Sequence, residues 1–591
     1  DENPPEKSPS KPIDFDGYLS PTMKKLFIGS GGGSWLYLFQ LQEPPDAPRV
    51  PDWLPDFQQS VATVAPSVKL DWFGAPVQEL HMHLGAKKIQ ILNLVIVLAV
   101  LVGFRFFFGT WMSGIVFWVT MTVTLAIVYG GFALSGGKQD LVFLSLFMVL
   151  TVASLEDFIF VALAKPGETA TLENFRSVAL PSFLTSLTTA FGFASLLTSE
   201  LQAIRLFGVW AAVGAMVEYF VVFMLLPAAI RLWPRTGQWV KSRPASESKG
   251  RKLLAFRLSP LIGLGTFAIF SVPLFNYDGF RVTQSPAHVF TNDHEVTRSF
   301  DRLVDTRGWI GNVDLVLDGG LARLEKRRIL DAITKEDAVS LVDDADSLAT
   351  MMTKSIEADD LRDLVTFQLK SLPAGKRYFA DSGRERAWVF LETLDINEVL
   401  RLRDLTREVC PEGQCGLEGE FMAFSEYSKS IVQTLFSSFL VSLVLVGLVL
   451  AACAYASGKM RSLPVVLISS FWAPFAILFV IWIFRIEVNF VTSVVLSVLV
   501  GLTGDNAIQY LFADDDLDEG AKRKGHASLL CSVSMIGVSL LFMFAPFEPT
   551  KLLGGLLALG FALVFIGDYS LLRGFSKPGS RFRAERPPTK A

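Results

Sequence analysis

The sequence is poor in charged residues, cysteine and histidine. Charged residues make up 19% of its 591 residues, below the roughly 25% of soluble proteins, and this composition excludes a disordered, fibrous or nucleic-acid-binding protein. Four cysteines are too few for a disulfide scaffold, and five histidines are too few to suggest a metal enzyme. The run "GSGGGS" at Gly29 lacks the spacing of a phosphate-binding loop, so the sequence gives no support for ATP hydrolysis.

Apolar residues are abundant instead. They make up 51% of the chain, which includes 49 phenylalanines and 12 tryptophans. A soluble globule cannot bury that much apolar surface, whereas a polytopic membrane protein exposes it to lipid through spans of about 20 residues each. Eleven segments fit this pattern, some of them short by a few residues: 92–108, 112–134, 141–163, 182–197, 206–232, 258–275, 431–455, 463–484, 490–512, 529–547 and 552–572.

Lysine and arginine are concentrated at three places outside these segments. They cluster in residues 231–252, in 522–524 and after residue 572. Cytoplasmic loops carry an excess of these residues, and alternating the spans places all three clusters on one side, which is therefore the predicted cytoplasm. Residues 1–90 and 276–430 then face outward.

Two of the four cysteines lie in the outward region. Cys410 and Cys415 could form a disulfide across "CPEGQC" if that region lies in an oxidising periplasm, and isolated thiols are the alternative. Cys453 and Cys531 fall inside predicted spans, where we expect them to be packing residues.

The second half of the chain repeats the first at an offset near 348 residues. "GSWLYLFQL" around Trp35 resembles "RAWVFLETL" around Trp388, and "LEDFIFVALA" around Asp157 aligns with "TGDNAIQYLF" around Asp505. Three further matches occur in the same order: "FGAPV" with "EGEFM", "SFLTSLTTAFGFASLL" with "SLLCSVSMIGVSLL", and "IRLFGVWAAVGAMVEYF" with "KLLGGLLALGFALVF". Repeats in an integral membrane protein are typical of secondary transporters.

The repeat predicts twelve spans, as six plus six, with an outer domain after the first span of each half. The partner of span 258–275 would precede residue 1, so we expect this sequence to lack the first span and about half of the first outer domain. Helical patterns such as "ARLEKRRILDAI" and strand-like runs such as "NVDLVLDG" predict a small α+β outer domain. The predicted organisation is a partial outer domain in 1–90, spans two to six in 91–233, a cytoplasmic linker in 234–257, span seven in 258–275, a second outer domain in 276–430, spans eight to twelve in 431–572 and a basic tail in 573–591.

Three of the acidic residues in the apolar segments are candidates for a proton relay. Glu156 and Asp157 lie in one half and Asp505 in the other. An ionised carboxylate at the bilayer centre costs about 2.5–3.5 kcal/mol on insertion scales, so such residues face the bundle interior or water. A carboxyl group that is neutral in one conformation and ionised in another carries a proton, which predicts a relay at these acids. The alternative is a structural role, in which the acids pair with Asn506 or with backbone between helices.

Hydroxyl groups near the acids are candidates for supporting hydrogen bonds. They are Thr188 and Thr189 in the first half and Ser532 and Ser534 in the second, with packing or bonding to their own helix as the alternative that we favour.

Four other ionisable residues lie in or beside the spans. Glu218 lies inside a span without an assigned role, whereas we expect Asp568 to reach water at the cytoplasmic end of the last span. His81 and His83 could bind a metal, but no cysteine or acid cluster accompanies them. We therefore expect a solvated pair at the membrane interface.

The arrangement of one span, an outer domain and five spans, made twice, resembles the resistance–nodulation–division (RND) superfamily. The stretch "LTSLTTAFGFASLL…RLFGVWAAVGAMVEYFVVFMLLPAAI" resembles its mycobacterial-membrane-protein-large (MMPL) branch and hopanoid-type exporters. The resemblance implies a polytopic α-helical bundle of six plus six spans with a pseudo-twofold axis. It also implies a proton relay at Asp157 with Glu156 and at Asp505 with Asn506. Many lipid-exporting members have Asp-Tyr at both places, where this sequence has Asp157-Phe158 and Asp505-Asn506.

The function implied by the resemblance is secondary export driven by the proton-motive force. A hydrophobic or lipid-like substrate would move from a bacterial inner membrane to the periplasm. The alternatives are a similar machine that assists polypeptide secretion and a sterol-sensing-like sensor that transports nothing. An enzyme is not expected, because no convergent Ser/His/Asp or His/Asp set is visible. The expected partners are the substrate, membrane lipids and a periplasmic acceptor, with no nucleic acid, no cofactor beyond the coupling proton, and a monomer favoured over a trimer.

Overall fold

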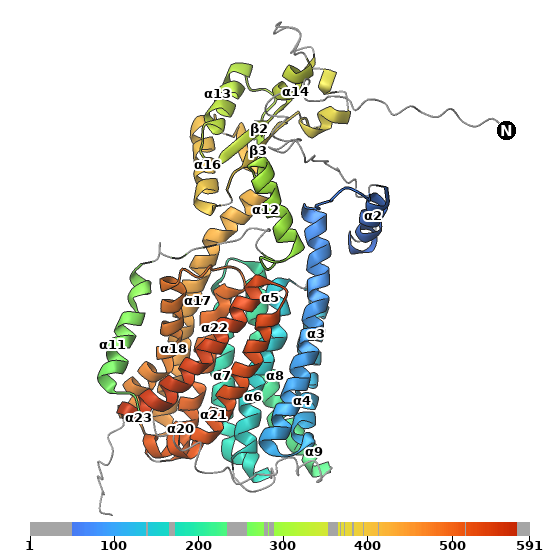
Figure 1. Ribbon diagram of the computed structural model, residues 1–591. Coiled ribbons are helices and arrows are strands. Elements are labelled where there is room, and N and C mark those ends of the chain that lie inside the picture. Colours follow the sequence, from blue (N-terminus) through green and yellow to red (C-terminus); the bar gives the residue numbers. More distant parts are fainter. Residues whose placement is uncertain are drawn as a thin grey trace, which may run out of the picture. The chain divides into compact units, whose positions relative to one another are not determined.

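The computed structural model describes residues 50–575 apart from 65, 138–139, 165–171, 233–256, 277–279, 281, 283–288, 353–364, 367, 371–372, 381–382, 394, 412 and 515. The run around Trp35, nearly all of the predicted linker and the tail from residue 576 lie outside the described residues. The chain forms two compact units, and Figure 1 shows the elements of each. The sheet unit comprises Asp1–His83 and Thr283–Ser428, and the bundle unit comprises Leu84–Val282 and Lys429–Ala591.

The bundle unit consists almost entirely of helices (Figure 1). The first half of the chain contributes α3 (Ala75–Phe108), α4 (Trp111–Leu134), α5 (Leu141–Leu144), α6 (Leu146–Ala162), α7 (Leu172–Ala194), α8 (Gln202–Phe220) and α9 (Leu226–Leu232). The second half contributes α11 (Pro260–Phe270), α17 (Glu420–Ala456), α18 (Leu463–Ile483), α19 (Val495–Thr503), α20 (Asp505–Ala513), α21 (Leu517–Leu541), α22 (Glu548–Phe565) and α23 (Leu572–Phe575).

Ten helical segments among the described residues are long and apolar enough to cross a membrane. They coincide with ten of the eleven predicted spans. The exception is predicted span 258–275, where the apolar helix covers only Pro260–Phe275 and is shorter than the about 20 residues that a straight span requires. The prediction of a polytopic helical protein is therefore confirmed, while the eleventh span stays a prediction.

The two segments that carry the predicted relay acids lie at the centre of the bundle unit. The apolar stretch of Thr492–Ala513 is 100% buried and that of Leu141–Ala162 is 83% buried, against 28% for Ala75–Phe108. Other spans expose large apolar side chains, for example Phe106 and Leu134, as contact with lipid requires. The acids therefore occupy a part of the bundle that protein, rather than lipid, surrounds.

Close glycine contacts show that the two halves of the bundle repeat one another. A Cβ atom on Gly208 of α8 would lie 2.7 Å from the carbonyl oxygen of Phe193, and one on Gly554 of α22 would lie 2.7 Å from that of Ser539. Both members of the second pair come 346 positions after their counterparts. The last span of each half therefore packs against the preceding span at the same point, as the predicted repeat requires.

A second pair of contacts relates the acid-bearing helices. Gly214 of α8 faces the side chain of Leu150 on α6, and Gly560 of α22 faces that of Leu499 on α19. The two glycines again differ by 346 positions, but the two leucines differ by 349. The equivalence of the acid-bearing helices is therefore shifted slightly from the offset that the sequence suggests.

The sheet unit contains a four-stranded antiparallel sheet in the order β2-β3-β1-β4. Helix α13 (Arg323–Thr334) connects β1 to β2, and α16 (Ile396–Val409) connects β3 to β4. This is the βαββαβ arrangement of ferredoxin-like domains, in agreement with the α+β pattern of the sequence. The strands are β1 (Gly311–Leu317), β2 (Val339–Asp343), β3 (Glu385–Leu391) and β4 (Cys415–Glu418), and the other helices include α2 (Val50–Val64), α12 (Glu295–Arg307) and α14 (Ala345–Met352).

Alternation along the strands explains how the sheet packs. Val313 of β1 lies on the face that α13 and α16 cover, where it clusters with Ile329 and Leu402. Phe390 of β3 points to the opposite face and clusters with Leu303 of α12. Because successive strand residues point to opposite faces, both faces of this sheet bury apolar side chains.

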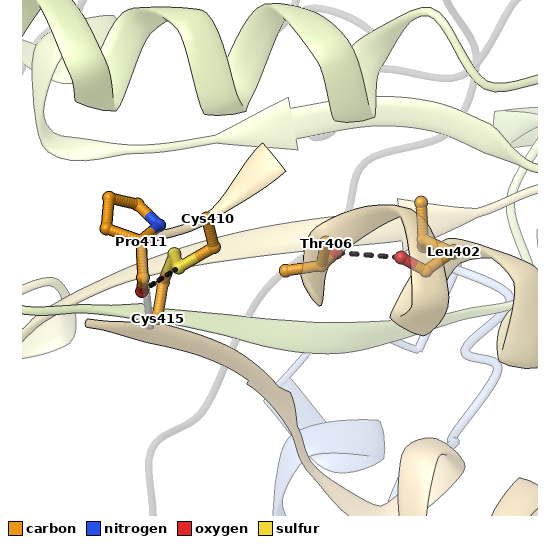
Figure 2. The surroundings of a disulfide bond; sticks show 5 residues. All are labelled: Leu402, Thr406, Cys410, Pro411 and Cys415. Atoms are coloured by element: carbon orange, nitrogen blue, oxygen red, sulfur yellow. Dashed lines mark hydrogen bonds between the residues drawn. A yellow bond between two sulfur atoms is a disulfide. The ribbon is translucent and has the colours of Figure 1, made fainter. Parts of the chain in front are cut away.

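A disulfide bond joins Cys410 to Cys415, so the pairing alternative applies rather than isolated thiols (Figure 2). Cys410 directly follows α16 and Cys415 opens β4, with their Cα atoms 6.0 Å apart. The Cys410 amide donates to the Thr406 carbonyl oxygen at 3.1 Å, and the Thr406 hydroxyl donates to the Leu402 carbonyl oxygen at 2.7 Å. The bond therefore closes the short turn between this helix and the last strand.

The two histidines of the predicted pair differ in their surroundings. His83 is exposed, as expected, but the ring of His81 lies edge-on to the rings of Phe290 and His294, with centroids 6.2 and 5.0 Å away. His81 is therefore half-buried beside two rings, whereas His83 is solvated as predicted. In the part of the chain that the structure describes, no three His, Cys, Asp or Glu side chains are grouped to hold a metal.

Candidate functional site

Four carboxylic acids meet inside the bundle unit. Glu156 and Asp157 lie on α6, Glu218 lies on α8, and Asp505 begins α20. At most 6% of the surface of each residue is exposed. Helices from both halves of the chain therefore contribute acids to one buried site.

Asp505 reaches this site at a break in its span. Helix α19 ends at Thr503 and α20 begins at Asp505, with Gly504 between them. The backbone N–H groups of a helix's first turn carry a partial positive charge, which favours a carboxyl group there. The break thus gives an electrostatic reason for an acid in an otherwise apolar segment.

Helix α7 approaches α19 closely enough to bond with it. A Cβ atom on Gly192 would lie 2.5 Å from the Cα atom of Gly501, so only glycine fits at this crossing. The approach lets the Thr189 hydroxyl donate to the Gly501 carbonyl oxygen at 3.2 Å. Thr188, which lies one turn of α7 before Gly192, donates its hydroxyl hydrogen to Asp505 Oδ1 at 3.0 Å. A first-half helix therefore binds the second-half acid directly.

The Thr188 hydroxyl has a second acceptor within reach. Its oxygen also lies 2.7 Å from the carbonyl oxygen of Thr185. A hydroxyl group has one proton to donate and lone pairs that accept. Thr188 can therefore donate to an ionised Asp505, or donate to Thr185 and accept from a protonated Asp505, so it suits both states of the acid.

Glu156 and Asp505 are neighbours, and both line one small cavity. No hydroxyl, amide or amine group donates to Glu156 Oε1. Two carboxyl groups can hydrogen-bond only while one of them carries a proton, and such a pair takes up protons as a unit. A proton shared by these two acids would therefore link the two halves.

Asp157 and Glu218 are a second pair of neighbouring acids, and both line the same cavity. The Ser186 hydroxyl of α7 donates to Asp157 Oδ2 at 3.0 Å, whereas Asp157 Oδ1 and Glu218 Oε1 receive no hydrogen bond from a hydroxyl, amide or amine. The sequence gives no signal for Ser186 beyond the abundance of hydroxyl groups in α7. Glu218 does carry a signal in the sequence, because an acid inside a membrane span is a candidate functional residue, but the sequence assigns it no role.

A small cavity connects all four acids. Its volume is about 10 Å³, which is close to the room that one water molecule needs. Carboxyl and hydroxyl groups line the cavity, and the remaining lining residues have small side chains. The lining residues are Ala153, Glu156, Asp157, Thr185, Ser186, Thr189, Ala215, Glu218 and Asp505.

No lysine, arginine or histidine in the described part of the chain forms an ion pair with these four acids. Four ionised carboxylates around one small cavity would repel one another in a medium of low dielectric constant, with no cation to offset them. Bound protons must therefore offset the negative charge, and the net charge of the site follows the number of protons bound.

The structure brings the predicted relay acids of both halves together. Glu156 and Asp157 of α6 and Asp505 of α20 all line the same cavity. The leucine contact with an offset of 349 residues lies in α19, before the break at Gly504, so it does not fix the offset at the acids. The equivalence of Asp157 with Asp505 therefore stays a prediction.

The four predicted hydroxyl residues have different surroundings. Thr188 bonds to an acid, and Thr189 lines the cavity while it donates to α19. Ser532 is buried but does not line the cavity. Ser534 donates to the Leu530 carbonyl oxygen of its own helix at 2.9 Å, as the favoured alternative predicts.

Asn506 and Asp568 form a separate contact. Asp568 is completely buried, so the expectation that it reaches water at the end of its span is wrong. It accepts a hydrogen bond from the Ser470 hydroxyl at 3.2 Å, and the side chain of Asn506 is a neighbour of its carboxyl group. Asn506 therefore faces this acid and does not line the cavity.

Two solved structures match much of this chain. One is the crystal structure of SecDF from Thermus thermophilus, described as a translocon-associated membrane protein, and it has a TM-score of 0.50. The other is SecDF in its super-membrane-facing form, with a TM-score of 0.49. In both cases the sequence identity is 13%, and the match covers 83% of this chain and 61% of SecDF. No family model and no curated protein matches the sequence.

The likeness concerns the fold. SecDF is an RND-superfamily membrane protein, and this chain spans about three-fifths of its length. The comparison does not address the MMPL and hopanoid-type branch, which rests on the sequence alone. Together with the ten apolar helices, it shows a polytopic α-helical membrane protein with an RND-like fold similar to that of SecDF.

Proposed function

We propose that the chain is a proton-driven secondary transporter of RND type and that the four-carboxyl cavity is its proton-binding site. One observation carries the proposal: Glu156, Asp157, Glu218 and Asp505 surround a water-sized cavity in an apolar bundle. No cation of the described residues pairs with them. Hydroxyl groups donate to Asp157 and Asp505, but a hydroxyl does not neutralise a carboxylate, so the interactions among these four acids depend on protons.

Proton binding at this site would change how the two halves attract each other. With one shared proton the Glu156–Asp505 pair is attractive, and without it two like charges face each other across the halves. A proton that crosses a potential of 100 mV releases about 2.3 kcal/mol. That energy shifts a two-state equilibrium by about fifty-fold, provided that the two states of the bundle differ in protonation.

We further propose a hydrophobic or lipid-like cargo that is exported from a bacterial inner membrane to the periplasm. The support is the resemblance of residues in α7 and α8 to the MMPL and hopanoid-type branch, together with the clustering of lysine and arginine on one predicted side. In this proposal the sheet unit faces the periplasm and passes the cargo to an acceptor there. The chain acts as a monomer.

Assistance to polypeptide secretion is the second candidate. The likeness in fold to SecDF, which is described as translocon-associated, favours it. The same proton site would then drive movements of the sheet unit that act on an emerging polypeptide. A sensor that transports nothing has no use for a proton-binding cavity, so the site gives that alternative no support.

Proteoliposomes with an imposed pH gradient test the proton coupling and the lipid-like cargo. A fluorescent phospholipid serves as the cargo probe, and we expect gradient-dependent transfer by the wild type, loss of that transfer in Asp505→Asn, and normal transfer in the control Ser534→Ala. Wild-type transfer by Asp505→Asn would contradict the proton site. No lipid transfer by any variant, with slower export of a reporter polypeptide in cells that carry Asp505→Asn, would favour the second candidate.

A further inference from the structure

Asp568 lies outside the cavity, yet none of its surface is exposed. It belongs to the π-helical segment Ile566–Leu571 between α22 and α23. Ser470 of α18 donates to its Oδ1 at 3.2 Å, and the side chain of Asn506 of α20 is a neighbour of its carboxyl group. Three spans of the second half therefore meet at this acid.

The π-helical segment explains how the acid reaches this position. A Cβ atom on Gly567 would lie 2.5 Å from the Ser469 carbonyl oxygen, so the segment touches the backbone of α18 and places the next residue beside Ser470. The widened turn also leaves the Ser570 carbonyl oxygen free to accept from the Leu258 amide at 3.1 Å. Single π-helical turns are rare and frequently mark functional sites.

Two buried oxygens at this contact have no hydrogen-bond partner. They are Asp568 Oδ2 and Asn506 Oδ1. The ionisable groups that act on Asp568 are the acids Asp505 and Glu156 and the phenol of Tyr510, and no cation of the described residues does so. Ionised Asp568 would therefore place a further negative charge beside the Glu156–Asp505 pair.

Asn506 suits both states of the acid. Its Nδ2 group donates to an ionised carboxylate, and its Oδ1 atom accepts from a protonated one. A partner that can turn between these states removes the penalty of an unpaired buried group in either of them. The two unpartnered oxygens are therefore the atoms that a proton on Asp568 would bring together.

The contact is the second-half counterpart of the Asp157–Glu218 pair. Asp157 directly follows Glu156, Asn506 directly follows Asp505, and Glu218 and Asp568 each belong to the last span of their half. In each half, an acid of the last span therefore lies beside the residue that follows Glu156 or Asp505. The repeat gives this position a relation to the proton site that an isolated buried acid lacks.

We propose that Asp568 is a further proton-binding site, which takes one proton from water and returns it to water in each cycle and is coupled to the Glu156–Asp505 pair through Asn506. The inference rests on the proposed function, because it assumes that protons drive the bundle. When the proton leaves Asp568, the side-chain amide of Asn506 rotates. Asp505 directly precedes Asn506 in the first turn of α20, and this proximity couples the two proton sites.

Infrared difference spectra between acidic and alkaline buffers test the inference on purified full-length protein in nanodiscs, without any cargo. Each carboxyl group that changes its proton contributes to the carbonyl stretch of protonated acids. We expect Asp568→Asn to remove one component of that band, Asp568→Glu to restore one, and Asp505→Asn to remove a different component. The control Ser534→Ala leaves the band unchanged.

The outcomes separate this inference from the proposed function. A spectrum of Asp568→Asn identical to that of the wild type means that Asp568 never exchanges its proton, which overturns the inference alone. A spectrum of Asp505→Asn identical to that of the wild type overturns the proposed function instead. If Asp568→Asn fails to fold, Ser470→Ala decides: loss of its hydrogen bond shifts one component to higher frequency if Asp568 titrates, and an unshifted band rejects the inference.

Discussion

Thr188 joins the first half of the chain to Asp505 through a single buried hydrogen bond of 3.0 Å. Thr188→Val keeps the shape of the side chain and removes the donor, so Asp505 Oδ1 is left buried without it. We expect the free energy of unfolding to fall by about 1–3 kcal/mol, the cost of an unsatisfied buried group. Unfolding by SDS in mixed micelles measures the change.

Ser534→Ala is the matched control for that substitution. Ser534 donates only within its own helix, so its loss should change stability by less than about 0.5 kcal/mol. Equal effects of the two substitutions would mean that the contact of Thr188 with Asp505 contributes nothing specific.

Asp343 gives the sheet unit a pH dependence. Burial raises its pKa above the ordinary value of 3.8, although Arg377 and the Tyr378 hydroxyl both favour its ionised form. A raised pKa means that the folded state binds the proton more tightly than the unfolded state. The contribution of Asp343 to stability is therefore greatest below pH 3.8 and is lost as the pH rises through the raised pKa.

Amide hydrogen exchange of β2 and β3 in the full chain measures this dependence, once the intrinsic effect of pH on exchange is removed. We expect protection to fall as the pH rises above 3.8, and to fall less steeply in Asp343→Asn. Part of the slope should remain, because burial also raises the pKa values of Asp314 and Asp344. An unchanged slope in Asp343→Asn would contradict the assignment.

The acids themselves are predictable from sequence, but their partners are not. Glu156, Asp157 and Asp505 each interrupt an apolar run, which marks them at once. Apolar runs align almost equally well at offsets of 348 and 349, and one residue turns a side chain by about 100° around its helix. Sequence alone therefore cannot show which side chains of α6 and α20 face one another, whereas the structure places Glu156, Asp157 and Asp505 around one cavity.

At the scale of elements, the crossing of α7 and α19 holds the site together. Gly192→Ala places a Cβ atom against the backbone of Gly501 and must push the helices apart. We expect lower thermal stability and loss of gradient-dependent transfer, because Thr188 and Thr189 then no longer reach α20 and α19. The melting temperature in detergent and lipid transfer in proteoliposomes check the two effects.

Gly537→Ala on α21 is the control for this crossing, because no atom lies within 4 Å of its Cβ position. Alanine favours the helix over glycine by about 1 kcal/mol, so this variant should be at least as stable as the wild type. Loss of transfer in both variants would show that any added methyl group disturbs the bundle, and the crossing would have no special role.

The disulfide is a second element-scale feature, since it joins α16 to β4 across five residue positions. Closing so short a loop restricts the unfolded chain only modestly, and we expect Cys410→Ser with Cys415→Ser to lower the stability of the sheet unit by about 2 kcal/mol. Hydrogen exchange of β1 and β4 measures the loss. Alkylation of both cysteines in the unreduced wild type would instead show that the bond is absent.

Element positions follow from sequence better than element irregularities do. Ten spans are predictable because each is an apolar run of the required length. The break at Gly504 and the π-helical segments Val221–Leu225 and Ile566–Leu571 are not, because they depend on contacts between helices. The wrong expectation for Asp568 has this origin, since the π-helical turn and Gly567 direct its side chain inward.

At the scale of the whole molecule, the repeat places equivalent helices around one shared site. Both halves supply acids, and the bond from Thr188 to Asp505 and the Glu156–Asp505 pair cross between them. The halves are not identical, because Glu156, Asp157 and Glu218 come from the first half and only Asp505 among the four acids comes from the second. This asymmetry predicts that protons bind the two halves unequally.

Proton movement in proteoliposomes tests the central claim most directly. A pH-sensitive dye inside the vesicles reports how fast an imposed gradient decays while the fluorescent phospholipid is transferred. If the buried carboxyl cluster carries the coupling proton, the wild type dissipates the gradient faster than protein-free vesicles, and Asp505→Asn dissipates it no faster than they do. Dissipation at the wild-type rate by a folded Asp505→Asn protein that still transfers the lipid would contradict the account.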